Sequence, residues 1–157
     1  IGVNRRVAYN PEALDELYGM EELDNLLPRA DVVAMSLPGN PSTYHVLNRE
    51  RIALLSSNAI VLNAGRGTAI DTDALSDALY EGKIAGAALD VTDPEPLPAE
   101  HPIWKAQGAI ITPHISGGYA LPETLQQIAE IFADNLRRYQ AGEALKNVID
   151  LETGYCK

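Results

Sequence analysis

The sequence predicts an α/β fold built on a doubly wound parallel sheet, and three observations support this prediction. Short apolar runs without in/out alternation recur along the chain, as in strands buried on both faces. Segments with helical spacing of apolar residues lie between these runs. The chain, with 157 residues of which 46% are hydrophobic, is long enough to bury one core of ordinary size. Strands that alternate with helices favour parallel pairing through right-handed crossovers.

Five segments are predicted to be strands. The first has the character of the end of a buried strand, and the other four are almost wholly apolar. In chain order they are residues 1–4, 31–37, 59–64, 84–91 and 109–112. Residues 147–150 are predicted as one further short strand.

Helical spacing predicts four helices, at residues 20–27, 48–55, 71–81 and 122–140. Asp71 and Thr72 can cap the third helix and Gly82 can end it. The fourth carries an apolar stripe and should end at Gly142. Residues 93–102 contain four prolines, which exclude a helix or a central strand there and predict a surface loop.

Composition excludes several classes of function. The net charge of −10 argues against binding of nucleic acid or of an anionic membrane surface, because both require clustered Lys and Arg. The single cysteine excludes an internal disulfide framework, and a cytoplasmic protein is predicted. The three histidines do not have the spacing of a metal-ligand set, so no metal site is predicted. His45 and His101 are interpreted as structural or surface residues.

Candidate site residues follow the predicted strands, where open α/β sheets bind their ligands. Arg66 can grip a carboxylate with its planar guanidinium, and its flanking glycines would let the backbone approach a ligand. His114 can exchange a proton near neutral pH. Glu95, if it reaches His114, would favour the imidazolium and orient the ring. Each residue taken alone also fits a structural or solvated surface role.

Four motifs in this order resemble the D-isomer-specific 2-hydroxyacid dehydrogenases. They are ADVVAMSLP at 30–38 with Thr43, IVLNAGRG at 60–67 followed by Ile70 and Asp71, ALDV at 88–91 with EPL at 95–97, and TPHISG at 112–117. The resemblance implies a Rossmann-like nucleotide-binding domain that transfers a hydride between NAD(P)H and a small 2-keto or 2-hydroxy acid. It also implies that Arg66 binds the substrate carboxylate, that His114 is the general acid/base and that Glu95 is its partner.

The resemblance further implies which residues line the cofactor. This predicted set contains Leu37, Pro38, Thr43, Ala64, Gly65, Arg66, Asp90, His114 and Gly117, with Asp90 near the nicotinamide amide. Asn4 stands where an acid would bind the adenosine ribose, and Arg5 and Arg6 follow it. These three residues predict that NADP is preferred over NAD as the cofactor.

Some features depart from the family pattern. Ser36 replaces the usual His or Asn, Ser56 replaces the usual Lys or Pro, and no Gly-x-Gly-x-x-Gly turn occurs. We therefore expect a fragment that lacks the first strand and the glycine-rich turn. Residues 1–142 are predicted to form the NAD(P)-binding domain, and 143–157 a tail returning toward a missing substrate domain. A homodimer is expected from the resemblance.

Two other functions stay open at this stage. The first is a non-catalytic, NAD(P)-sensing binding protein of the same fold, against which the joint presence of Arg66, Glu95 and His114 argues. The second is a formate-type dehydrogenase, whose hydride transfer needs no acid for a carbonyl oxygen. Those relatives carry a neutral amide in place of Glu95, so the carboxylate counts against this alternative.

Overall fold

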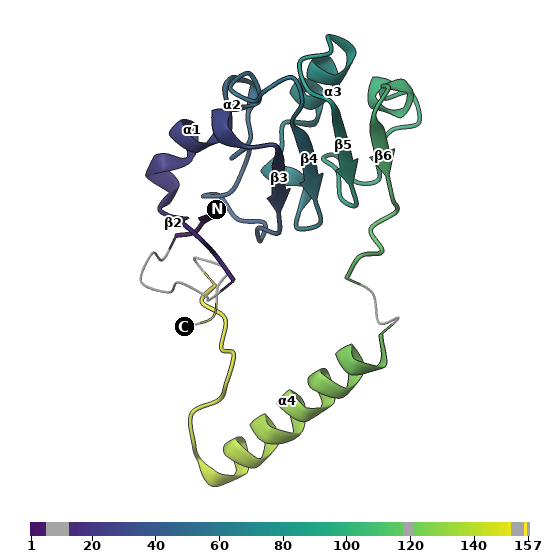
Figure 1. The fold of residues 1–157 in the computed structure, drawn as a ribbon. Coiled ribbons are helices and arrows are strands. Elements are labelled where there is room, and N and C mark those ends of the chain that lie inside the picture. Colours follow the sequence, from purple (N-terminus) through teal and green to yellow (C-terminus); the bar gives the residue numbers. More distant parts are fainter. Residues whose placement is uncertain (6–12, 118–120, 152–155, 157) are drawn as a thin grey trace.

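A parallel sheet of four strands forms the main body of the computed structural model, which describes residues 1–5, 13–117, 121–151 and 156 (Figure 1). The sheet order is β3-β4-β5-β6. The strands are β3 (Val32–Met35), β4 (Ile60–Asn63), β5 (Gly86–Leu89) and β6 (Ala109–Ile111). All three pairings are parallel, so the predicted α/β class and these four strands are confirmed. Their carboxyl ends all point toward the same edge of the sheet.

Short helices follow the strands. They are η1 (Met20–Glu22), α1 (Leu23–Leu26), η2 (Leu27–Arg29), α2 (Arg49–Ile52), η3 (Gly67–Ala69), α3 (Thr72–Tyr80) and η4 (Pro102–Lys105). The side chain of Asp71 accepts a hydrogen bond from the Ala74 amide and so caps α3 as predicted. Gly82, with φ of 64°, follows the end of α3.

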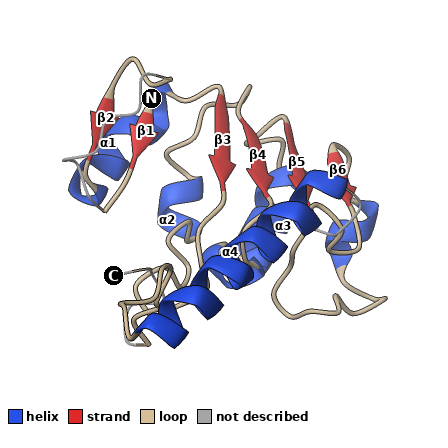
Figure 2. Ribbon diagram, turned by 90° about the horizontal axis from the view of Figure 1, so that it is seen from below, coloured by secondary structure: helices blue, strands red, loops and turns tan. Residues whose placement is uncertain are grey.

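One face of the sheet is covered and the other is open. Figure 2 shows α2 and α3 on one side of the strands, and the core lies between these layers. Leu75 of α3 and Val61 of β4 are both fully buried there. On the opposite face Ile60, Leu62 and Ile110 remain exposed. Both faces of the sheet therefore carry apolar side chains, as in a buried parallel sheet. Within the described residues, however, helices cover only one of these faces.

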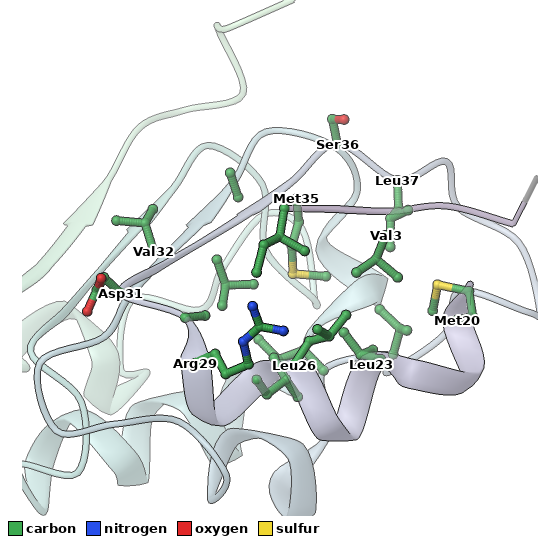
Figure 3. A pocket seen from close by; sticks show the side chains of 17 residues that line it. Val3, Met20, Leu23, Leu26, Arg29, Asp31, Val32, Met35, Ser36 and Leu37 are labelled. Atoms are coloured by element: carbon green, nitrogen blue, oxygen red, sulfur yellow. The ribbon is translucent and has the colours of Figure 1, made fainter. Parts of the chain in front are cut away.

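A second, smaller sheet pairs β1 (Gly2–Val3) in parallel with β2 (Leu17–Tyr18). The strand β2 was not predicted, because two residues are too few to show a periodic pattern. A cavity of about 480 Å³ lies between this small sheet and β3. Figure 3 shows apolar side chains of its wall, among them Val3, Leu26 and Met35.

The longest helix, α4 (Pro122–Ala141), stands apart from the sheet beyond its carboxyl edge (Figure 1). Its limits match the predicted helix, and Gly142 ends it with φ of 71°. The predicted apolar stripe is present but exposed, as Phe132 and Tyr139 show at 70% and 75%. The prediction of a strand at 147–150 was wrong, because Ile149 forms only an isolated bridge with Cys156.

We predict that residues 1–157 on their own will melt at low temperature or without cooperativity and will bind NAD(P)H weakly. The reason is physical: the open sheet face and the cavity beside β3 leave apolar surface and ladder edges uncovered. Circular dichroism during heating and titration with NADPH measure both properties. Cooperative melting together with tight cofactor binding would contradict this prediction.

Candidate active site

His114 and Glu95 lie together at the carboxyl edge of the sheet. The Nδ1 atom of His114 is 2.7 Å from Oε1 of Glu95, and both side chains are a little over 40% exposed. A carboxylate at this distance accepts a hydrogen bond from Nδ1–H and orients the ring. The other ring nitrogen, Nε2, is then the one that can face a substrate.

Asp90 holds the loop that carries His114. This carboxylate follows β5 and is buried; its Oδ1 accepts hydrogen bonds from the Thr112 hydroxyl at 2.5 Å and the Ile115 amide at 2.9 Å. Its Oδ2 accepts one from the Ser116 amide at 2.8 Å. Hydrogen bonds from Ser116, Thr112 and Ile115 hold the pKa of Asp90 well below its usual range, so the group stays ionised at neutral pH.

The backbone of His114 has a conformation that needs this support. Its φ is 53°, in the left-handed region that non-glycine residues seldom adopt. The His114 amide donates to the Asp90 carbonyl at 2.9 Å, so backbone and side chain of Asp90 both contact this loop. His114 therefore projects from a turn that Asp90 stabilises at both ends.

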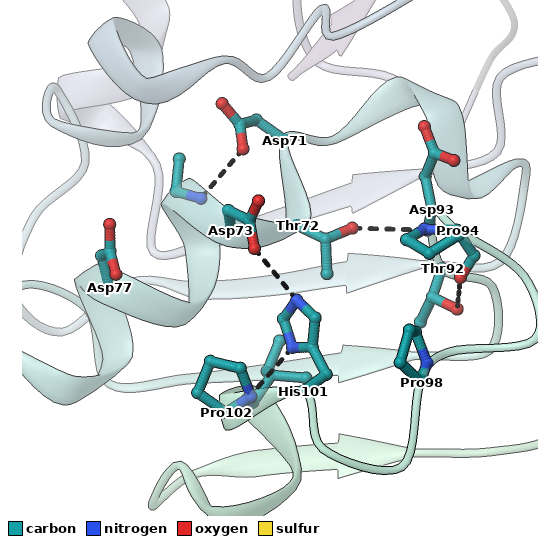
Figure 4. Close-up of polar contacts among 12 residues, drawn as sticks. Asp71, Thr72, Asp73, Asp77, Thr92, Asp93, Pro94, Pro98, His101 and Pro102 are labelled. Atoms are coloured by element: carbon teal, nitrogen blue, oxygen red, sulfur yellow. Dashed lines mark hydrogen bonds and ion pairs between the residues drawn. The ribbon is translucent and has the colours of Figure 1, made fainter.

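The proline-rich loop that carries Glu95 is anchored to α3 and η4 (Figure 4). The Asp93 amide donates to the Thr72 hydroxyl at 3.3 Å, and Thr92 bonds the Pro94 carbonyl within the loop. Farther along, the nearly buried His101 ring contacts Asp73 at 3.1 Å and accepts a hydrogen bond from the Ile103 amide. These contacts place Glu95 within reach of His114.

Arg66 lies on the loop between β4 and η3, and the two glycines beside it lie close to neighbouring loops. A Cβ atom on Gly65 would lie 2.6 Å from the Leu37 backbone, and one on Gly67 would lie 1.9 Å from the Thr92 carbonyl oxygen. The absence of side chains at both glycines thus lets this loop pack closely against the neighbouring loops. Because Gly67 contacts Thr92, Arg66 lies next to the segment that leads to Glu95.

The Arg66 side chain is exposed, and its Nη1 donates to the Gly65 carbonyl at 2.8 Å. Among the described residues, no hydrogen bond or ion pair joins Arg66 to Glu95 or His114. The structure therefore brings Glu95 and His114 into contact and places Arg66 on an adjoining loop at the same sheet edge.

The predicted cofactor residues occupy the ends of several strands. Asn4 and Arg5 are exposed after β1, and Arg6 lies outside the described residues. Ala64 and Asp90 border a cavity of about 220 Å³ whose wall is mostly apolar, including Leu62, Ala88 and Ile110. This cavity opens on the uncovered sheet face, beside the reactive loops.

The remaining predicted cofactor residues differ in accessibility. Leu37 and Pro38 are half-buried after β3, and Gly117 is exposed beyond the His114 loop. Thr43 is buried, and its hydroxyl donates to the Pro38 carbonyl at 2.6 Å. The Thr43 hydroxyl therefore shapes the turn after β3.

His45 and His101 are structural, as predicted. The His45 ring stacks on Tyr44 with ring centroids 4.0 Å apart, and its φ is 45°. The His101 side chain caps η4. The described residues contain no group of three or more His, Cys, Asp or Glu side chains arranged for a metal ion. Among them there is also no helix with the length and apolarity needed to cross a bilayer.

Sequence reasoning missed Asn63. This last residue of β4 is 2% exposed, and its side chain contacts both ends of the turn that leads to Arg66. The signal that could have found it is the position of a polar amide at the end of an otherwise apolar strand.

Comparison with known proteins gives a consistent result. The model of the D-isomer specific 2-hydroxyacid dehydrogenase NAD binding domain matches residues 1–116. A glyoxylate reductase from Thermofilum pendens is 41% identical over 131 residues, which are 83% of this chain and 38% of that protein. The chain spans less than half the length of such curated relatives.

Two solved structures show the same fold. A D-isomer specific 2-hydroxyacid dehydrogenase from Xanthobacter autotrophicus Py2, in complex with NADPH and MES, has a TM-score of 0.83 at 36% identity, covering 98% of this chain and 62% of that one. An NADPH-dependent glyoxylate/hydroxypyruvate reductase from Sinorhizobium meliloti has a TM-score of 0.81 at 28% identity, covering 98% and 48%.

Proposed function

The chain belongs to the D-isomer-specific 2-hydroxyacid dehydrogenase family through its NAD-binding domain, and from this membership we propose its function. It provides the cofactor domain and the reacting side chains of an oxidoreductase that transfers a hydride between NAD(P)H and a small 2-keto or 2-hydroxy acid. The observation that carries the proposal is the 2.7 Å pair of His114 and Glu95 beside the Arg66 loop.

Each reacting side chain has a defined part in this proposal. Arg66 binds the substrate carboxylate through two parallel hydrogen bonds and so orients the carbonyl carbon. His114, as imidazolium, donates a proton to the carbonyl oxygen during reduction and accepts it back during oxidation. Glu95 accepts a hydrogen bond from Nδ1–H and fixes the ring, so that Nε2 faces the substrate.

The residues present fit the nicotinamide end of a dinucleotide. The apolar walls of the 220 Å³ cavity suit a flat ring, and Asp90 and Ala64 lie at its border. Leu37, Pro38 and Gly117 would complete the contacts, and Asn4 with Arg5 would bind the adenosine ribose. When bound, the nicotinamide supplies or accepts the hydride.

Turnover is the direct test of this function. The protein, expressed with any sequence that flanks residues 1–157 in its gene, should reduce glyoxylate, hydroxypyruvate or pyruvate with NADPH or NADH. His114→Asn should lower kcat by about 10²- to 10⁴-fold, because it removes the general acid. Cofactor binding without turnover of any small 2-keto acid would instead favour a non-catalytic, NAD(P)-sensing protein.

Glu95→Gln should lower kcat for keto-acid reduction. The amide keeps the shape of the side chain but is neutral, so it accepts the hydrogen bond from Nδ1–H of His114 more weakly and fixes the ring less firmly. Steady-state kinetics of both enzymes with glyoxylate measure kcat. Glu100→Gln removes an exposed charge from the same loop and should leave kcat unchanged; an unchanged kcat for Glu95→Gln would contradict the role of Glu95.

NADPH should be preferred over NADH. Asn4 and Arg5 lie at the carboxyl end of β1, where an acid would exclude a 2′-phosphate and an arginine would bind it. The ratio of kcat/KM values for the two cofactors measures the preference, and Asn4→Asp should lower that ratio. Asn58→Asp, at the opposite end of the sheet, is the matched control. A strong wild-type preference for NADH would refute the assignment.

We also propose the setting in which the domain works. Residues 1–142 form the cofactor-binding domain, and 143–157 lead away from it toward the part of the relatives that this chain does not span. The protein acts as a cytoplasmic homodimer without nucleic-acid or membrane partners. Sedimentation equilibrium should give twice the mass of the subunit; a monomer at micromolar concentration would rule out the dimer.

A further inference from the structure

We propose that Asn63 is a positioning residue for Arg66, an inference that rests on the proposed role of Arg66 in binding the substrate carboxylate. Asn63 is the last residue of β4 and is 2% exposed, so its amide is removed from solvent. A buried amide at this place requires hydrogen-bond partners, and both partners it has belong to the Arg66 turn.

Three hydrogen bonds connect Asn63, Gly65 and Arg66. Oδ1 of Asn63 accepts a hydrogen bond from the Gly65 amide at 3.1 Å, and Nδ2 donates to the Arg66 carbonyl at 3.0 Å. Nη1 of Arg66 donates to the Gly65 carbonyl at 2.8 Å. The guanidinium therefore contacts the Gly65–Arg66 peptide group, and Asn63 contacts the peptide groups on either side of it.

Both hydrogen-bonding groups of the Asn63 amide are needed for this arrangement. Asp would keep the acceptor for the Gly65 amide but would place an oxygen against the Arg66 carbonyl oxygen. Ser would keep an acceptor for the Gly65 amide two residues along and would be too short to reach the carbonyl. Only an amide at this distance accepts from one end of the turn and donates to the other.

The neighbouring loops make the turn sensitive to this loss. Gly65 already lies against the Leu37 backbone and Gly67 against the Thr92 backbone, so the loop has little room to adjust. If the hydrogen bonds from Asn63 were lost, the turn would shift and would move the guanidinium relative to the substrate carboxylate. Small displacements of such an anchor lower catalytic efficiency considerably.

The test is a double-mutant cycle with Arg66→Ala, measured as kcat/KM for a 2-keto acid such as glyoxylate in the full polypeptide. In the protein that retains Arg66, Asn63→Asp should lower kcat/KM about 10- to 100-fold. Most of this loss should appear in KM for the keto acid, with KM for the cofactor unchanged. Asn63→Ser should act in the same direction.

In the Arg66→Ala background, the same Asn63 changes should have little further effect. The Asn63 side chain contacts only backbone atoms of the turn, so any purely structural role persists in that background, whereas positioning of the guanidinium does not. Equal losses in the two backgrounds would overturn the inference, as would no loss in the Arg66 background. Melting temperatures of all variants identify losses that come from unfolding.

A matched control and a separate outcome complete the design. Asn48 caps α2 with its Oδ1, a contact that Asp makes equally well, so Asn48→Asp should leave kcat/KM within about twofold. If Arg66→Ala alone leaves kcat/KM for keto acids unchanged, the proposed function of Arg66 fails. That result is obtained without any Asn63 variant. Failure of the proposed function of Arg66 can therefore be distinguished from failure of the proposed role of Asn63.

Discussion

The hydrogen bonds that the buried Asp90 carboxylate accepts from the Thr112–Ser116 loop are the interaction on which the rest of the site depends. Without them, a non-glycine residue at φ of 53° would relax toward the ordinary right-handed or extended region. His114 would then lose its approach to Glu95. Because the same hydrogen bonds lower the pKa of Asp90, the carboxylate remains an acceptor throughout the neutral pH range.

The parallel sheet brings the reactive loops together through its hydrogen-bond register. The pairing continues past the last strand residues, since the Asp90 amide donates to the Asn63 carbonyl and the Thr112 amide donates to the Leu89 carbonyl, both at 2.9 Å. Adjacent parallel strands lie about 4.8 Å apart, so the loops that leave them start side by side. Asn63 and Asp90, at the ends of neighbouring strands, then stabilise the loops of Arg66 and His114.

Much of the fold followed from the sequence because its elements have strong local signals. The four strands of the sheet are apolar runs, α3 begins at the capping residue Asp71, and α4 starts with Pro122 and ends at Gly142. The strand β2 and the lone bridge of Ile149 were beyond local reasoning, because neither depends on a periodic pattern. For the site, the strand-end rule located Arg66 and His114. The amide contacts of Asn63 and the close approaches of Gly65 and Gly67 are tertiary, and residue type alone does not reveal them.

The 480 Å³ cavity separates two functions that the proposed enzyme must combine. Arg66, Glu95 and His114 all belong to the side of the structure built on β3 to β6, whereas Asn4 and Arg5 follow β1 in the small sheet. The cavity wall is largely apolar, and residues of both β1 and β3 line it. The proposed adenosine-binding residues and the proposed hydride-transfer residues therefore lie on opposite sides of this cavity. A cofactor bound as proposed would span both sides, so the placement of the small sheet relative to the main sheet links folding of the domain to its proposed chemistry.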